Sequence, residues 1–382
     1  MYPIAYIVLF LIYAIMALVY NYSGPKNRSW IKFATLALFI FFFGFKGFIG
    51  DDWLRYAPYF NGMYYDNIDN IINTITNSGY EMGFSVLQAV CKLIYPDYFF
   101  FIFVCTVIKC ALLYNFLKNR VDNLPFAFMV FICMSGTILE INYLRNSLSI
   151  LIYLNALTYL IERKPLPYFG LCFLAMSFHI SSVLYLPLYF ILHKTMPRWA
   201  YITIFSLLTI LLLAQISLIA PALNFVASFM GENYVRLVKI YTEGAMGAVA
   251  GRLSIGVLER LMTGVLIICY YNKLVEIKKE NILYINAFLL YFLSFAILRE
   301  FDELSRRIAI LFVFSYWVLW CDLLKCFFYK GNRLLYTLFF FCYGIMKVYS
   351  STNEPKFEYD NILFGAKSYE ERYTIYMINK KK

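Results

Sequence analysis

The sequence predicts an all-α, polytopic integral membrane protein with about twelve transmembrane helices, within a range of roughly ten to thirteen. Hydrophobic residues make up 62% of the 382-residue chain and charged residues only 15%, whereas about a quarter of the residues in a soluble domain are charged. The mean hydropathy is +0.65. Apolar runs close to the roughly 20 residues that cross a bilayer recur along the whole chain, and no soluble domain fits between them.

Ten apolar runs are the expected membrane-crossing elements. In chain order they are Pro3–Tyr20, Ile31–Phe45, Tyr98–Leu117, Leu124–Leu139, Ser147–Ile161, Tyr201–Ala220, Ser254–Tyr271, Ile282–Leu298, Ile308–Leu324 and Leu334–Met346. The first run is too long, and too poorly followed by a cleavage site, to be a removable signal peptide.

Two further apolar segments are expected to be irregular, because counting either as an ordinary crossing would invert the sidedness of the later loops. Glu81–Tyr95 covers only about 22 Å at the helical rise, short of the ~30 Å hydrocarbon core, and is predicted to be a re-entrant or interfacial helix on the outer side. Pro167–Leu192 is predicted to form two short helices that meet around Ser177–His179, where non-helical backbone needs protein or water beside it.

The net charge of +11 is distributed in the pattern of a membrane protein rather than of a nucleic-acid partner. Basic residues gather in alternate short gaps and acids in the others, so the basic gaps are expected to be cytoplasmic and the N-terminus outside. Residues 1–350 are predicted to be one polytopic membrane domain with outer loops at 50–80, 221–251 and 299–307. Residues 351–382 are expected to be a C-terminal tail, for which the outer side is favoured.

The nine cysteines lie in apolar segments without a CxxC motif, and the chain has two histidines. This usage favours buried structural cysteines over a zinc site or a disulfide framework. The sequence therefore predicts neither a metal nor another cofactor.

Ionisable residues at membrane depth are costly and usually face a polar chamber. Arg145 and His179 are in this position, and other cations collect on the predicted outer side. The candidates for binding an anion such as a lipid pyrophosphate, by the planar fork of arginine or the charge of lysine, are Lys46, Arg145, Arg252, Arg306 and Arg307. Simpler alternatives stay open for these residues. Arg306 and Arg307 would then serve only as partners of Glu300, Asp302 or Glu303, and Glu259 would neutralise Arg252. Arg145 would be a snorkelling interface residue, and His179 a satisfied histidine at a helix break.

Aromatic residues in the first outer loop stand beside carboxylates and favour carbohydrate contact, because the C–H faces of sugar rings stack on aromatic rings. The candidates for sugar binding are Trp53, Arg55 and Tyr56. A cap at the bilayer surface would use the same residues, so that alternative remains open.

Five short motifs, in the correct order from about Phe45 to Phe314, resemble those of EpsG-like proteins, which belong with the Wzy-type polymerases of bacterial surface polysaccharides. They are Gly50-Asp51-Asp52-Trp53 with Tyr56, Tyr80-Glu81 with Gly83-Phe84, Tyr143-Leu144-Arg145-Asn146, Ser177-Phe178-His179 with Leu186-Pro187, and Arg307 with Phe312. The chain departs from the family pattern at Lys46, Met82 and Asn146, where arginine, proline and glutamine are usual.

The resemblance implies a membrane glycosyltransferase that joins undecaprenyl-pyrophosphate-linked oligosaccharides at the outer face of the bacterial inner membrane, with the pyrophosphate lipid as leaving group. Candidate partners are this substrate, membrane lipid, and a chain-length regulator and flippase of the same pathway. The chemistry needs fixed cations at the leaving group and a base at the acceptor hydroxyl. The candidate bases are Asp52, Glu81 and His179.

Three other function classes are weighed against the polymerase. A transporter or flippase of lipid-linked sugars should show internal repeats with broken helices at the midplane, and no clear repeat is found. A membrane O-acyltransferase would need a catalytic histidine reached from the cytoplasm, whereas His179 is predicted on the outer side. A non-catalytic scaffold would not need a chamber lined by arginine side chains.

Overall fold

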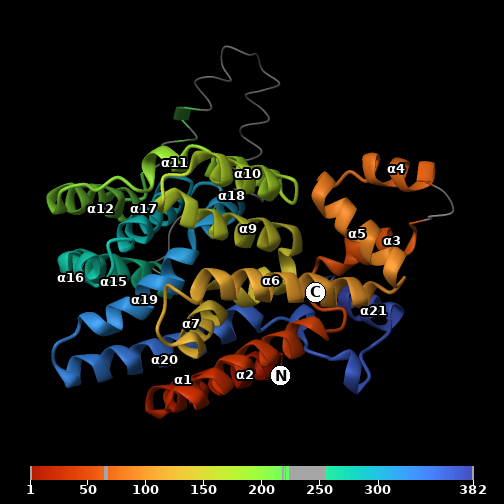
Figure 1. The fold of residues 1–382 in the computed structure, drawn as a ribbon, viewed down its shortest axis with the longest axis horizontal. Coiled ribbons are helices and arrows are strands. Elements are labelled where there is room, and N and C mark those ends of the chain that lie inside the picture. The colour runs from red at the N-terminus through yellow and green to blue at the C-terminus, as the bar shows by residue number, and fades with distance from the viewer. Residues whose placement is uncertain (1, 64–67, 217–218, 220, 223–253, 381–382) are drawn as a thin grey trace. The chain divides into compact units, whose positions relative to one another are not determined.

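The computed structural model describes residues 2–63, 68–216, 219, 221–222 and 254–380. Every element in these ranges is a helix, and their only β feature is a single bridge between Lys46 and Asn361. The chain divides into two compact units, Met1–Tyr189 with Lys330–Lys382, and Phe190–Tyr329. Figure 1 shows the helices of both units, which are described separately below. The all-α class predicted from the sequence is confirmed for the described residues.

The first unit holds the N-terminal helices and the end of the chain. Its helices are α1 (Ile4–Tyr22), α2 (Pro25–Gly44), α3 (Trp53–Asn61), α4 (Ile68–Thr76), α5 (Met82–Ile94), α6 (Tyr98–Leu117), α7 (Leu124–Phe131), η1 (Ile132–Gly136), α8 (Thr137–Asn142), α9 (Leu144–Ile161), α10 (Pro165–Met176), η2 (Ile180–Tyr185), α20 (Lys330–Thr352), η4 (Pro355–Phe357), η5 (Ile362–Phe364) and α21 (Tyr369–Lys380). Helix α11 (Leu188–Ile191) follows at the division between the units.

The second unit is shorter, and part of its sequence lies outside the described residues. Its described helices are α12 (Arg198–Leu213), α15 (Ile255–Cys269), α16 (Tyr271–Ile277), α17 (Asn281–Ile297), α18 (Asp302–Ala309), η3 (Ile310–Phe312) and α19 (Phe314–Cys326). Within this unit α17 packs against α12, α18 and α19.

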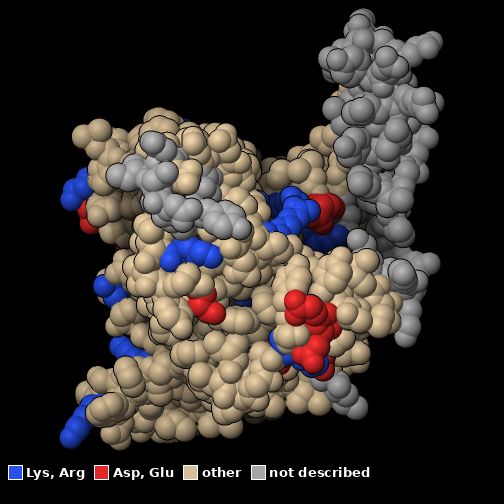
Figure 2. Space-filling view, turned by 90° about the vertical axis from the view of Figure 1, so that its right-hand side faces the viewer, with Lys and Arg blue, Asp and Glu red and all other residues tan. Residues whose placement is uncertain are grey.

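Each of the ten predicted apolar runs coincides with a helix or a helix pair. Among the described residues, five helices are long and apolar enough to cross a membrane, or up to seven if each of two bent helix pairs is one span. Most of the surface in Figure 2 carries no Lys, Arg, Asp or Glu side chain, as a lipid-facing surface requires. These features are those of a multi-pass membrane protein, while the predicted count of about twelve crossings is not confirmed.

The predicted break in Pro167–Leu192 is confirmed, and α5 is short, while its re-entrant or interfacial position stays a prediction. Helix α5 has 13 residues, which at the helical rise is about 20 Å and too short for an ordinary span. Helix α10 ends at Met176, and the 3-10 helix η2 begins at Ile180, so the break falls at Ser177–His179. His179 is extended there, with φ −158° and ψ 123°.

Side-chain caps fix where several helices of the first unit begin. Asp97 accepts a hydrogen bond from Phe100 N at 2.9 Å at the start of α6, and Asn123 does the same for Phe126 N at the start of α7. Such caps satisfy backbone N–H groups that have no partner inside the helix. Helix α6 then packs against α2 and α9, and α9 packs against α10, so α9 lies between α6 and α10 (Figure 1).

The residues expected to form a tail pack against the first unit. Arg372 on α21 is 3% exposed, and its Nε donates to the carbonyl oxygen of Phe48 at 2.6 Å. Its Nη1 donates to a carboxylate oxygen of Glu358 at 2.9 Å. Because a buried guanidinium needs several acceptors, these contacts anchor α21 beside the segment that follows α2.

A buried ion pair lies between two helices of the same unit. Lys109 on α6 pairs with the carboxylate of Glu140 on α8, and both side chains are fully buried. The ammonium of Lys46 donates to the backbone carbonyl of Glu140. The charges of this pair are thus matched within the protein, as buried charges must be.

Candidate functional site

A tight turn positions the motif Gly50–Trp53, in the loop predicted to be the first outer loop, against the end of α8. Gly50 has φ +80°, a conformation that favours glycine, and a Cβ atom there would collide with the side chains of Asn142 and Ile141. Asp51 N donates to Asn142 Oδ1 at 2.9 Å. Trp53 Nε1 donates back to the Gly50 carbonyl at 2.9 Å. The turn therefore holds the start of α3 next to the junction of α8 and α9.

Asp52 lies at the N-terminus of α9. Its Oδ2 accepts a hydrogen bond of 2.8 Å from the backbone N–H of Leu144, the first residue of that helix. Burial raises the pKa of the Asp52 carboxyl to about 7, against the lowering effects of the Leu144 N–H and of the nearby cations Lys46 and Arg145. Close to neutral pH, this carboxyl can therefore exist in either protonation state, as a general base requires.

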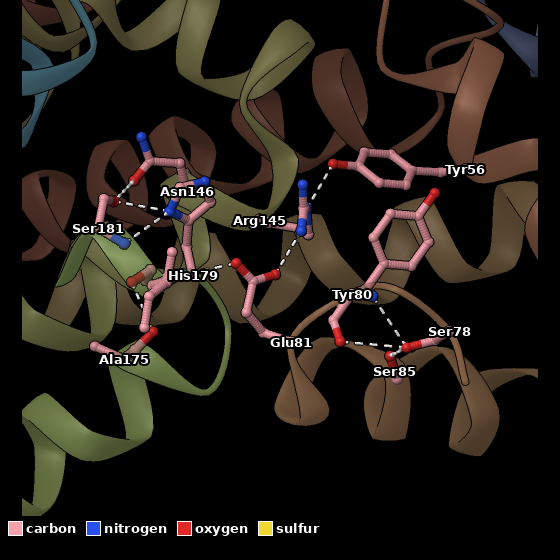
Figure 3. A network of polar contacts seen from close by, with 12 residues as sticks. Tyr56, Ser78, Tyr80, Glu81, Ser85, Arg145, Asn146, Ala175, His179 and Ser181 are labelled. Atoms are coloured by element: carbon pink, nitrogen blue, oxygen red, sulfur yellow. Dashed lines mark hydrogen bonds and ion pairs between the residues drawn. The ribbon is translucent and has the colours of Figure 1, made fainter. Parts of the chain in front are cut away.

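Arg145, the second residue of α9, stands at the centre of a polar network (Figure 3). Its Nε donates to the hydroxyl of Tyr56 at 2.8 Å, and its Nη1 pairs with Glu81 Oε2. The guanidinium carbon also lies 4.9 Å from the ring centroid of Tyr80 and 6.0 Å from that of Phe84. These partners fix the plane of the guanidinium while the side chain keeps 21% of its surface exposed, so it can still meet a ligand.

Glu81 joins the start of α5 to the break after α10. Its Oε1 accepts a hydrogen bond of 3.1 Å from Ile180 N. In return, the carbonyl of Ser177 accepts from Gly83 N at 2.7 Å and from Phe84 N at 3.3 Å. A Cβ atom at residue 83 would lie 2.9 Å from that carbonyl oxygen, which explains the glycine. Both carboxylate oxygens of Glu81 are therefore engaged, one by Arg145 and the other by the Ile180 N–H.

His179 occupies the break itself, on the other side of Glu81 in Figure 3. Its Nδ1 accepts from Ser181 N at 3.2 Å and lies 2.7 Å from Ser181 Oγ. Ser181 Oγ is also 3.4 Å from Asn146 Oδ1, and Asn146 follows Arg145 in α9. The structure thus brings the three candidate bases, Asp52, Glu81 and His179, around the first turn of one helix.

The structure shows other contacts for three of the four remaining predicted cations. Lys46 is 6% exposed and its ammonium points to the Glu140 carbonyl. Arg306 and Arg307 belong to the second unit and pair with Glu303, at 3.6 and 2.6 Å, which is one of the alternatives left open by the sequence. Arg252 lies outside the described residues. The pyrophosphate-binding roles of these four cations stay predictions.

The predicted sugar-binding residues differ in exposure. Trp53 and Tyr56 are 4% and 5% exposed; Trp53 packs against Phe48 and Tyr369, and burial raises the pKa of the Tyr56 hydroxyl well above its usual value. Arg55 is exposed on α3. A stacking role for the two buried rings stays a prediction, since their present contacts are with protein.

Several contacts of the site involve residues that sequence reasoning did not assign to it. Tyr80 and Phe84 flank the guanidinium of Arg145, and Ser181 orients His179. Tyr80 and Phe84 belong to a motif identified in the sequence, but the sequence did not indicate that their rings contact the guanidinium of Arg145. Among the described residues, no group of three or more His, Cys, Asp or Glu side chains is placed to hold a metal ion.

Comparisons with known proteins give one result. The model of the EpsG family matches residues 29–363 of this chain, a range that contains all five motifs and every residue of the network described above. No curated protein and no solved structure gives a significant match.

Proposed function

Because the chain belongs to the EpsG family, a membrane family of polysaccharide biosynthesis, we propose that it polymerises undecaprenyl-pyrophosphate-linked oligosaccharide repeat units. The reaction takes place at the outer face of the bacterial inner membrane. Each cycle transfers the growing chain from its lipid carrier to the next lipid-linked unit. In the proposed topology the chain crosses the membrane about twelve times, and the first outer loop faces the periplasm. A flippase supplies the substrate, and a chain-length regulator acts on the product.

One observation carries this proposal: Arg145 is held rigidly beside Asp52. The guanidinium is fixed by Glu81 and by the hydroxyl of Tyr56, and Asp52 binds the backbone N–H of the preceding residue. A fixed cation and a titratable carboxyl on one turn of one helix are the two groups that glycosyl transfer from a pyrophosphate needs. The residues that build this pair come from three separate segments of the chain, around residues 52–56, 81 and 144–145.

The proposed reaction breaks the bond between the anomeric carbon of the growing chain and its pyrophosphate oxygen. A hydroxyl of the incoming unit forms the new bond to that carbon and loses its proton to Asp52. The electron pair of the broken bond stays on the pyrophosphate, where the remaining N–H groups of Arg145 donate to the developing charge. Preorganised donors of this kind lower the barrier because they need no rearrangement during the reaction.

We prefer Asp52 to Glu81 and His179 as the base because of the contacts that these two side chains already make. Both carboxylate oxygens of Glu81 are occupied, one by Arg145 and one by the Ile180 N–H, so an acceptor hydroxyl would have to displace one of these contacts. His179 Nδ1 faces Ser181, so only its other ring nitrogen is directed elsewhere. In this assignment Glu81 positions Arg145. His179 either holds the backbone of residues 177–181 in place or donates a hydrogen bond to the pyrophosphate.

The decisive experiment uses the purified full-length protein in liposomes. Lipid-linked repeat units from a strain that lacks the polymerase serve as substrate, and products are separated by length. We expect a ladder of polymers together with released undecaprenyl pyrophosphate. Transport of intact units across the liposome membrane without any lengthening would identify a transporter instead.

A further inference from the structure

A cavity of about 210 Å³ lies between the first outer-loop motif and the C-terminal helix α21. Gly50, Asp51 and Trp53 form one wall, and Ile375, Tyr376 and Asn379 form the other. The volume is below the range of roughly 300–1,000 Å³ that holds a drug-sized ligand, so the cavity has room for one small ring. Asp52, the proposed base, lies in the sequence between Asp51 and Trp53, which both line the cavity.

One face of α21 is built toward this cavity. Arg372, Ile375, Tyr376 and Asn379 line it, and their spacing of three, four and seven residues places them on a single helical face. Tyr376 and Asn379 are partly exposed, whereas Arg372 is buried against Phe48 and Glu358. The helix is therefore anchored by one residue of this face and offers the other side chains to a ligand.

The anchoring contacts leave the cavity without a free cation for a phosphate. Lys356, on the cavity wall, pairs with Asp51 at 3.0 Å and with Glu354 at 3.2 Å. Arg372 is engaged by the Glu358 carboxylate. With each cation matched by a carboxylate, the lining suits a neutral, hydroxyl-rich ligand better than an anion. Its aromatic rings, amide and carboxylate are side chains that bind polar rings with C–H faces.

We propose that this cavity binds one uncharged sugar residue of the acceptor oligosaccharide. Tyr376 supplies an aromatic surface for the ring, and Asn379 and Asp51 bind its hydroxyl groups. Helix α21 lies beyond residues 29–363, the range matched by the family. The wall that α21 supplies therefore lies outside the matched range, and the subsite selects which repeat unit can be extended. This inference rests on the proposed function, because it assigns the substrate of that reaction.

The test compares variants of two cavity residues with a matched control. Tyr376→Ala and Asn379→Ala shorten side chains that line the cavity. Tyr373→Ala removes an aromatic ring from the same helix; Tyr373 is 43% exposed and outside the cavity lining. The three positions are partly exposed, so the variants should fold alike, which thermal melting of the purified full-length proteins verifies.

The first measurement is calorimetric binding of a lipid-free oligosaccharide, the repeat unit cleaved from the host's own surface polysaccharide. We expect wild type and Tyr373→Ala to bind equally and each cavity variant to bind about tenfold more weakly, the effect of losing roughly one good contact. Equal binding by all four proteins overturns the proposal, as does the absence of binding to wild type. Competition by inorganic pyrophosphate also overturns it, because the cavity would then be an anion site.

The second measurement is polymerisation by the same proteins in liposomes. The cavity variants should raise the KM for lipid-linked repeat units about tenfold and leave kcat nearly unchanged, which is the signature of lost substrate binding. If wild type makes no polymer, the proposed function fails, and the calorimetric result still decides whether the cavity binds the oligosaccharide. If wild type makes polymer and the cavity variants match it in both measurements, only the cavity assignment fails.

Discussion

Arg145 donates a hydrogen bond of 2.8 Å from its Nε to the hydroxyl of Tyr56, although 89 residues separate the two in sequence. The contact turns the guanidinium edge toward α3, while Glu81 holds a second edge from the start of α5. Tyr56 and Glu81 belong to two different sequence motifs. Arg145 is therefore the residue through which the first outer loop, α5 and α9 meet.

Replacing Arg145 by lysine is expected to lower polymerisation by about 10²–10³-fold, the cost of losing one preorganised donor to a developing charge. Lysine keeps the charge but cannot contact Tyr56, Glu81 and a ligand in one plane. Polymer length and amount, measured at equal membrane abundance, provide the readout. Arg198→Lys, at the start of α12 and exposed, is the matched control. Full activity of Arg145→Lys would contradict the leaving-group assignment.

Polymerisation should rise with pH through an apparent pKa near 7, because Asp52 can accept a proton only when it is ionised and burial raises its pKa to about 7. Asp52→Asn should lower the rate by about 10²–10⁴-fold and abolish this dependence. The measurement is the rate per enzyme between pH 5.5 and 8.5, at roughly half-unit steps across that window. If Asp52→Asn keeps more than about a tenth of the wild-type activity, Asp52 is not the base and serves only to cap α9.

The same titration has a consequence for stability that does not depend on catalysis. Burial raises the pKa of Asp52 in the folded protein to about 7, well above that of an exposed carboxyl, so folding favours the protonated form. This contribution to stability is lost as pH rises from about 4 through about 7. Asparagine has no proton to lose. The melting temperature of Asp52→Asn relative to wild type should therefore be higher at pH 8 than at pH 4. No change in this difference with pH would show that the carboxyl titrates normally.

Part of this architecture could be predicted from the sequence. The apolar runs located the helices, and the charge alternation correctly required a break near Ser177–His179, because both are local or additive properties of the chain. The pairing of Arg145 with Glu81 could not be predicted, since 64 residues separate them and the intervening helices decide their distance. The motifs did select both residues, each for a separate role.

The C-terminal segment makes contacts that composition does not reveal. Residues 351–382 are rich in charged side chains and were expected to form a tail, yet Arg372 is buried. Its acceptors are the Phe48 carbonyl and Glu358, and the first of these lies 324 residues away. Lys109 was missed for a related reason: it stands alone in the apolar run Tyr98–Leu117, and its partner Glu140 follows the run Leu124–Leu139. A single charge inside a run of about 20 apolar residues was the available signal.

Gly83→Ala is expected to destabilise the first unit by about 1–3 kcal/mol, the usual cost of overpacking. The added Cβ would meet the side chain and carbonyl of Ser177, pushing α5 away from the break and stretching the contact between Glu81 and Ile180. Gly170→Ala is the control, because nothing lies within 4 Å of a Cβ there and alanine favours a helix. Thermal melting of the purified variants provides the comparison, and equal melting temperatures would contradict the tight docking.

Lys109→Leu should destabilise the protein by about 3–5 kcal/mol, because it leaves the buried Glu140 carboxylate without its cation. The double variant Lys109→Leu with Glu140→Leu should recover most of this loss, since no uncompensated charge then remains. Melting of the single and double variants gives the coupling between the two sites. Additive effects would mean that the two side chains do not interact in the folded protein.

The first outer loop and the C-terminal helix should lie on the same side of the membrane. Gly50 N donates to the Lys356 carbonyl at 2.8 Å, and two segments joined in this way cannot be separated by a bilayer. The chain must then cross the membrane an even number of times between residues 50 and 356. In a cysteine-free background, Asn61→Cys and Glu371→Cys, both exposed, should react with a membrane-impermeant maleimide added outside. Lys194→Cys should react only after permeabilisation, because its gap is predicted to be cytoplasmic. Labelling of Asn61→Cys and Glu371→Cys from opposite sides would contradict the docking of α21 and with it the sugar subsite.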